Sequence, residues 1–129
     1  EKMLSLEGDS GPYLQYAHAR ARSILRKAGK HIAHGFLTVL VEPQELSILR
    51  MFPKFPEIIE LAVLEYRPNI LAHYLSDLAS KFNTIYAVLP VLKAEEERVK
   101  NTRLKLVYAV AHILKTGLNL LGIEAPERM

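Results

Sequence analysis

Apolar residues recur every three or four positions along most of the chain, which is the period of an α-helix with one buried face. A first helix is predicted over residues 10–28. Asp9 or Ser10 can cap its N-terminus, Pro12 suits its first turn, and Gly29 suits its end. Its apolar stripe consists of Leu14, Ala17, Ala21, Ile24, Leu25 and Ala28.

The same period predicts four further helices, over residues 43–52, 56–66, 68–89 and 95–121. A proline stands first in three of them, where its missing N–H is not needed. The last begins with three glutamates, whose charge is favourable near the positive end of the helix dipole. Residues 30–42 could form a short strand or a buried loop and are predicted to be irregular, as are residues 122–129.

Five helical segments with short, proline-marked links predict an all-α fold, a bundle of about five helices. Its length of 129 residues fits one domain, which we place at residues 10–129. Residues 1–9 read as a linker from a preceding domain, because the chain opens without an initiator Met and without a turn. The sequence therefore reads as a piece of a longer protein.

Composition narrows the class of protein only slightly. Half of the residues are hydrophobic and 24% are charged, which is usual for a soluble globular chain. The chain has no cysteine, which fits a reducing compartment such as the cytoplasm, and no apolar run of the ~18 residues that a membrane span needs. The net charge of +3 suits an anionic partner without requiring one.

Catalytic and metal-binding patterns are weak. His31 and His34 have a spacing that could chelate a metal on a helix, but no third ligand accompanies them. The glutamates at 95–97 are explained by the start of a helix. The sequence contains no phosphate-binding or dinucleotide glycine pattern. We therefore predict no catalytic residue and no metal site in this chain.

Basic and aromatic residues interleave in the first predicted helix, and further cations lie in the last one. Phosphates attract such charges, and unstacked RNA bases stack on tyrosine or arginine planes. A solvated basic face with tyrosines half in the core would give the same composition. The residues concerned are Tyr13, Tyr16, His18, Arg20, Arg22, Arg26, Lys27 and Lys30, then Arg98, Lys100, Arg103, Lys105 and Lys115.

Particular stretches of the sequence are more specific than this composition. "EGDSGPYLQYAHAR", "FPEIIELA", "LAHYLSDLASKFNTIYAVLPVL", "RLKLVYAVAHILKTGLNLLGI" and "APERM" occur in order. Together they resemble the C-terminal anticodon-binding domain, of the DALR type, of arginyl-tRNA synthetases. The resemblance covers nearly the whole chain except residues 29–42, and the DALR motif itself is not present literally.

The resemblance implies a function in translation. The parent protein would be a class I ligase that attaches arginine to its tRNA with ATP and Mg²⁺, and its catalytic signatures would lie upstream. This piece would bind the anticodon loop of arginine tRNA, would hold no cofactor itself and would be inactive alone. Its partners would be the tRNA and the upstream catalytic domain of the same chain. A cytoplasmic monomer without membrane contact is expected.

The resemblance also implies individual contacts to the anticodon loop. Tyr13 and Tyr86 would supply stacking faces, Arg26 a phosphate or base-edge contact, and Met129 an apolar wall for the middle base. Arg128 could face phosphate or pair with an acid. The candidates for phosphate contacts are Arg20, Lys27 and Arg128.

Each contact has an alternative without RNA. Tyr86 could be a half-buried core residue, Tyr13 could pack against the catalytic domain, and Met129 could lie at a frayed end. Gln15 and Tyr16 are interpreted as interdomain packing.

For the domain as a whole, the alternative is a helical protein-interaction module that keeps the fold without RNA binding. Such a module would present apolar surface on residues 30–42 to a protein partner.

Overall fold

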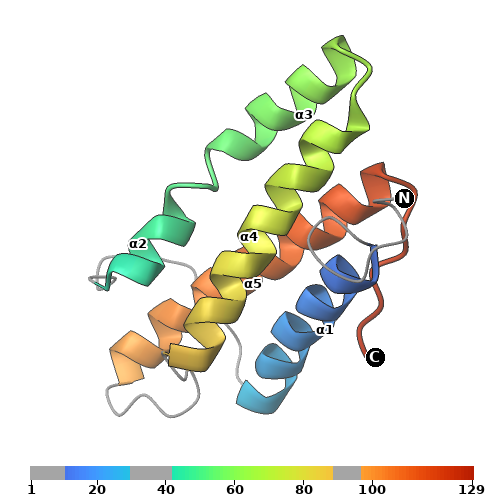
Figure 1. Cartoon of the computed structure of the whole chain (residues 1–129). Helices are drawn as coiled ribbons and strands as arrows, with labels where there is room; N and C mark the ends of the chain where they lie inside the picture. Colours follow the sequence, from blue (N-terminus) through green and yellow to red (C-terminus); the bar gives the residue numbers. More distant parts are fainter. Residues whose placement is uncertain (1–10, 30–41, 89–96) are drawn as a thin grey trace.

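The computed structural model describes residues 11–29, 42–88 and 97–129, and these form five α-helices and no strand (Figure 1). The predicted all-α bundle is confirmed. No helix in the described part of the chain is long and apolar enough to span a membrane. The helices are α1 Gly11–Ala28, α2 Pro43–Leu49, α3 Lys54–Leu64, α4 Pro68–Val88 and α5 Glu97–Leu120.

The predicted boundaries fail between α2 and α3. Helix α2 ends at Leu49, earlier than predicted, because the amides of Met51 and Phe52 bond three residues back instead of four. Helix α3 begins at Lys54, two residues before Pro56. The proline falls within the first turn, where an N–H has no partner in the helix, so it does not have to be the first residue.

Three helices surround the core. Helix α1 packs along α5, α4 packs against both, and α2 and α3 lie on α4 (Figure 1). The helical period of apolar residues therefore correctly predicted the helices that contribute most of the core. Four residues of the stripe predicted for the first helix are buried, namely Leu14, Ala17, Ala21 and Ile24. The core residues of α4 and α5 include Leu71, Leu75, Leu78, Phe82, Ile85, Leu106, Val107, Val110, Leu114 and Leu118.

Helices α4 and α5 approach closely at Gly117. A Cβ atom on this residue would lie 2.6 Å from both Leu75 Cδ atoms, which is too close for any real contact. Leu75 and Gly117 are both buried. A larger residue here would force the Leu75 side chain to move, so the close approach of the two helices favours glycine.

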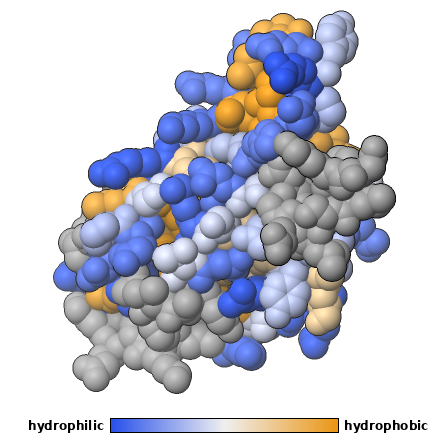
Figure 2. Space-filling model, in the orientation of Figure 1, coloured by the Kyte–Doolittle hydropathy of each residue, from blue (hydrophilic) through white to orange (hydrophobic). Residues whose placement is uncertain are grey.

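At the end of the molecule where α3 meets α4, apolar side chains are exposed among hydrophilic ones (Figure 2). Helix α3 has no buried residue, and Tyr66 in the turn after it is 92% exposed with a φ of 54°. A hollow of about 410 Å³ lies here, lined by Ile59, Ala62, Val63, Tyr66, Pro68, Leu71, Leu120 and Leu121.

Candidate nucleic-acid interface

Helix α1 holds the C-terminal tail, residues 122–129, against one of its faces. Gln15 Nε2 donates to the Glu124 carbonyl at 2.8 Å, and Arg26 Nη1 donates to the Glu127 carbonyl at 2.9 Å. Between them, the Arg22 guanidinium meets the Glu127 carboxylate at 3.2 Å. Gln15 and Arg22 are seven residues apart and Arg22 and Arg26 are four apart, so the three side chains lie in one row along the helix.

His18 belongs to the same row and is fully buried. Its Nδ1 lies 3.0 Å from the Pro126 carbonyl, and since a carbonyl can only accept, Nδ1 carries the proton. Nε2 is buried and has no hydrogen-bond partner among the described residues. Burial lowers the pKa of His18 below 6.5; the Pro126 bond and Glu127 raise it, while Arg22 and Lys115 lower it.

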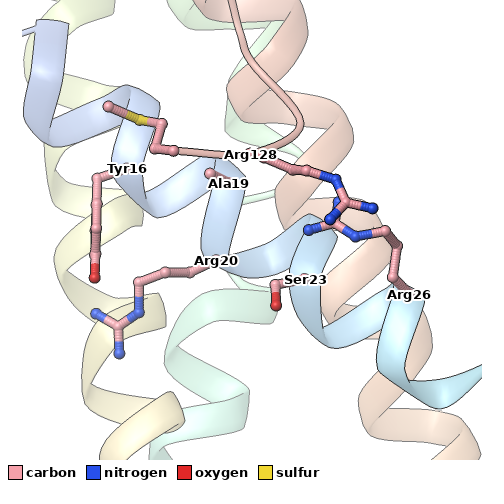
Figure 3. A pocket seen from close by; sticks show the side chains of 7 residues that line it. Tyr16, Ala19, Arg20, Ser23, Arg26 and Arg128 are labelled. Atoms are coloured by element: carbon pink, nitrogen blue, oxygen red, sulfur yellow. The ribbon is translucent and has the colours of Figure 1, made fainter.

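The end of the tail and the outer face of α1 enclose a depression of about 690 Å³. Three of its lining side chains carry guanidinium groups, and those of Arg26 and Arg128 point toward one another (Figure 3). Two adjacent positive charges repel unless an anion lies between them. The lining residues are Tyr16, Ala19, Arg20, Ser23, Arg26, Arg128 and Met129.

A series of hydrogen-bonded side chains connects this depression to α4. The Arg20 guanidinium carbon lies 5.7 Å from the centre of the Tyr16 ring, and its Nη1 donates to Asn83 Oδ1 at 3.0 Å. Asn83 Nδ2 in turn donates to the Tyr13 hydroxyl at 3.3 Å. These contacts fix Arg20 beneath the exposed ring of Tyr16.

The predicted site residues divide into groups. Arg20, Arg26, Arg128 and Met129 are all in the lining of the depression, although they come from both ends of the sequence. Tyr13 is half-buried against the core and bonds to Asn83, so its hydroxyl lies toward α4.

Two further candidates lie apart from the depression. Lys27 is exposed on α1 but does not line it. Tyr86 belongs to helix α4, and its side chain lies outside what the structure describes. Residues 30–41, which hold nearly all of the surface invoked for a protein-interaction module, also lie outside the described residues.

Sequence reasoning missed Ser23 and Asn83 and gave Tyr16 a different role. Tyr16 lines the depression and is 54% exposed. Its position four residues before Arg20 on the same helix face was the available signal. No pattern in the sequence indicated Asn83, because it lies on another helix and meets Arg20 only in the folded chain.

The chemistry of the depression suits an anion with a flat apolar part. Guanidinium groups bind phosphate oxygens, and the tyrosine ring and methionine side chain offer apolar contact to a base. The hollow at the end of α3 has no charged lining residue and does not suit such a ligand. Within the described ranges, no cluster of three His, Asp or Glu side chains could hold a metal ion.

An all-helical bundle with a basic and aromatic depression on its first helix is compatible with an RNA-binding domain. The model of the DALR anticodon binding domain matches residues 14–129, and the chain belongs to this family. The resemblance inferred from the sequence motifs is thereby confirmed.

Curated relatives match the chain over its whole length. Arginine–tRNA ligase of Thermococcus kodakarensis is 46% identical, and arginine–tRNA ligase 2 of Bacillus anthracis is 44% identical. The chain spans only 21% and 22% of the lengths of these two relatives.

Solved structures of similar fold also come from arginyl-tRNA synthetases. Arginyl-tRNA synthetase of Thermus thermophilus superposes with a TM-score of 0.87 at 44% identity, covering 98% of this chain and 22% of that one. A putative arginyl-tRNA synthetase of Campylobacter jejuni gives a TM-score of 0.84 at 29% identity, covering 99% of this chain and 29% of that one. The fold is thus that of one part of a much longer synthetase.

Proposed function

We propose that this chain binds the anticodon loop of arginine tRNA as a domain of an arginine–tRNA ligase. The observation that carries the proposal is the depression in which Arg20, Arg26 and Arg128 surround Tyr16 and Met129. Membership of the anticodon-binding family supports RNA as the ligand, and the names of the relatives support arginine tRNA.

The side chains divide into two roles. Arg26 and Arg128 would bind backbone phosphate, which relieves the repulsion between them. Tyr16, held by Arg20 and exposed, would stack on an unpaired base, and Met129 would form the opposite apolar wall. Tyr13 and Tyr86 would contact the loop from outside the depression, as the family resemblance implies. Lys27 would be a further phosphate contact there.

The remaining functions of the parent would reside elsewhere in its chain. A catalytic domain upstream would use ATP and Mg²⁺ to activate arginine, and this domain would bind neither. We expect a monomer that works in the cytoplasm, where translation requires it.

The test measures binding of the chain to an arginine tRNA transcript over a series of salt concentrations. Affinity should fall steeply with salt and should exceed that for another tRNA. Replacing Arg128 by Gln should lower the slope of log affinity against log salt by about 0.7 to 1, as expected for one lost phosphate contact. Footprinting should show protection of the anticodon loop.

Arg50→Gln is the matched control, because Arg50 is an exposed cation at the end of α2 and its loss changes net charge equally. Equal slopes for the two variants would exclude a specific role of Arg128. Absence of anticodon-loop protection at low salt would favour the protein-interaction module instead.

A further inference from the structure

The tail forms part of the depression but has no regular structure of its own. Residues Gly122–Met129 contain no helix or strand, and both Arg128 and Met129 are exposed. An exposed segment without secondary structure samples many conformations unless other groups hold it. Something must therefore keep its last two residues over the outer face of α1.

The bonds from α1 supply this restraint. Gln15, His18 and Arg22 bond to Glu124, Pro126 and Glu127 in that order, so the tail runs along α1 in the same direction as the helix. None of the three lines the depression. They act on the segment immediately before the residues that do.

We propose that Gln15, His18 and Arg22 are positioning residues for the RNA site, which hold the tail so that Arg128 and Met129 are preorganised as one wall of the depression. The inference rests on the proposed function and adds residues that need not touch RNA. Its physical basis is that a wall fixed before binding does not lose conformational freedom when the ligand arrives.

His18 is central but is a poor test, because it is fully buried and its replacement would affect folding. Gln15 and Arg22 are only partly buried and can be changed with little effect on the core. The test therefore uses Gln15→Leu with Arg22→Met, alone and together, and measures the affinity for arginine tRNA by titration at fixed salt.

The double variant should bind the tRNA roughly tenfold more weakly, within the range of couplings in hydrogen-bonded networks. Its melting temperature should stay close to that of the unsubstituted chain. The methyl resonance of Met129, labelled with ¹³C, should move toward the position and narrow line of a mobile methionine.

A chain that stops after Glu127 separates positioning from direct contact. Without Arg128 and Met129 there is no wall to position, so the same double substitution should change affinity little further. Arg50→Met controls for the lost charge and should leave both the affinity and the Met129 signal nearly unchanged.

Two results would overturn the inference. Unchanged affinity in the double variant would show that the tail needs no such restraint. A tenfold loss that persists in the shortened chain would show that Gln15 or Arg22 touches RNA directly. If the unsubstituted chain shows no preference for arginine tRNA, the proposed function itself fails, which is a different outcome from either.

Discussion

At the scale of single residues, His18 shows how a buried polar group limits the conditions under which the fold is stable. Nδ1–H bonds to the tail, whereas Nε2 faces the interior without a described partner. A second proton would place a charge in a site that does not solvate it. Burial is the main reason that the pKa of His18 is lowered from 6.5, so the folded chain favours the neutral ring.

This predicts that His18 makes folding stability depend on pH. Above about pH 6.5 the ring is neutral in both states and its contribution is fully present. As the pH falls through 6.5, the unfolded chain binds a proton that the folded chain does not, so the free energy of unfolding decreases until the lowered pKa is reached. Urea unfolding of the parent chain and His18→Gln, between about pH 8 and 5.5, should give a difference that shrinks on acidification.

His112→Gln, which removes an exposed imidazole, is the matched control. Parallel curves for the parent chain and His18→Gln across this range would contradict the assignment.

The residue scale is also where sequence reasoning about the site was least complete. The sequence predicted that Tyr13, Tyr16 and Arg20 lie on one helix, and the structure confirms this. Spacing alone could not show that the tail covers the row of Gln15, His18 and Arg22. The tail has no period, so its path depends on hydrogen bonds that no local pattern encodes.

At the scale of elements, α2 is attached to the bundle by a charge pair as well as by apolar contacts. The Arg103 guanidinium of α5 donates to the Glu45 carboxylate of α2 at 3.1 Å, and the two side chains are only 15% and 2% exposed. Ile48 and Met51 are buried as well. The sequence showed a short amphipathic helix here, but not this partner, because it lies 58 positions away.

Replacing one partner of this pair should lower the free energy of unfolding more than replacing both partners. Arg103→Met leaves the Glu45 carboxylate buried without its partner and should lower the free energy of unfolding by about 3 kcal/mol. Glu45→Met combined with Arg103→Met should recover most of that loss, because no buried charge remains. Urea unfolding of the two single variants and the double variant gives the coupling directly. Additive losses would show that the pair is not coupled.

At the scale of the whole molecule, the bundle has an inner and an outer part. Helices α1, α4 and α5 share the core, whereas α3 has no buried residue and packs mainly on α4. The apolar period predicted that all of these helices exist, but it indicates only which face is apolar and not how deeply that face is buried. Burial depth depends on how many other helices cover a face, which is a property of the assembled fold.

This division predicts two levels of stability in hydrogen exchange. Amides of α3 should exchange through a local opening that needs less free energy than global unfolding, whereas amides in the middle of α5 should require the whole bundle to unfold. Leu114 is fully buried in α5, and Leu114→Ala should lower the exchange free energy of α5 amides by about 2 to 5 kcal/mol. The exchange free energies of the α3 amides should stay unchanged as long as local opening remains the easier route.

Leu64→Ala, at the exposed end of α3, is the matched control and should leave the exchange free energies of the α5 amides unchanged. If Leu114→Ala lowered the values for α3 and α5 equally, the five helices would unfold as one unit and the outer position of α3 would have no energetic consequence.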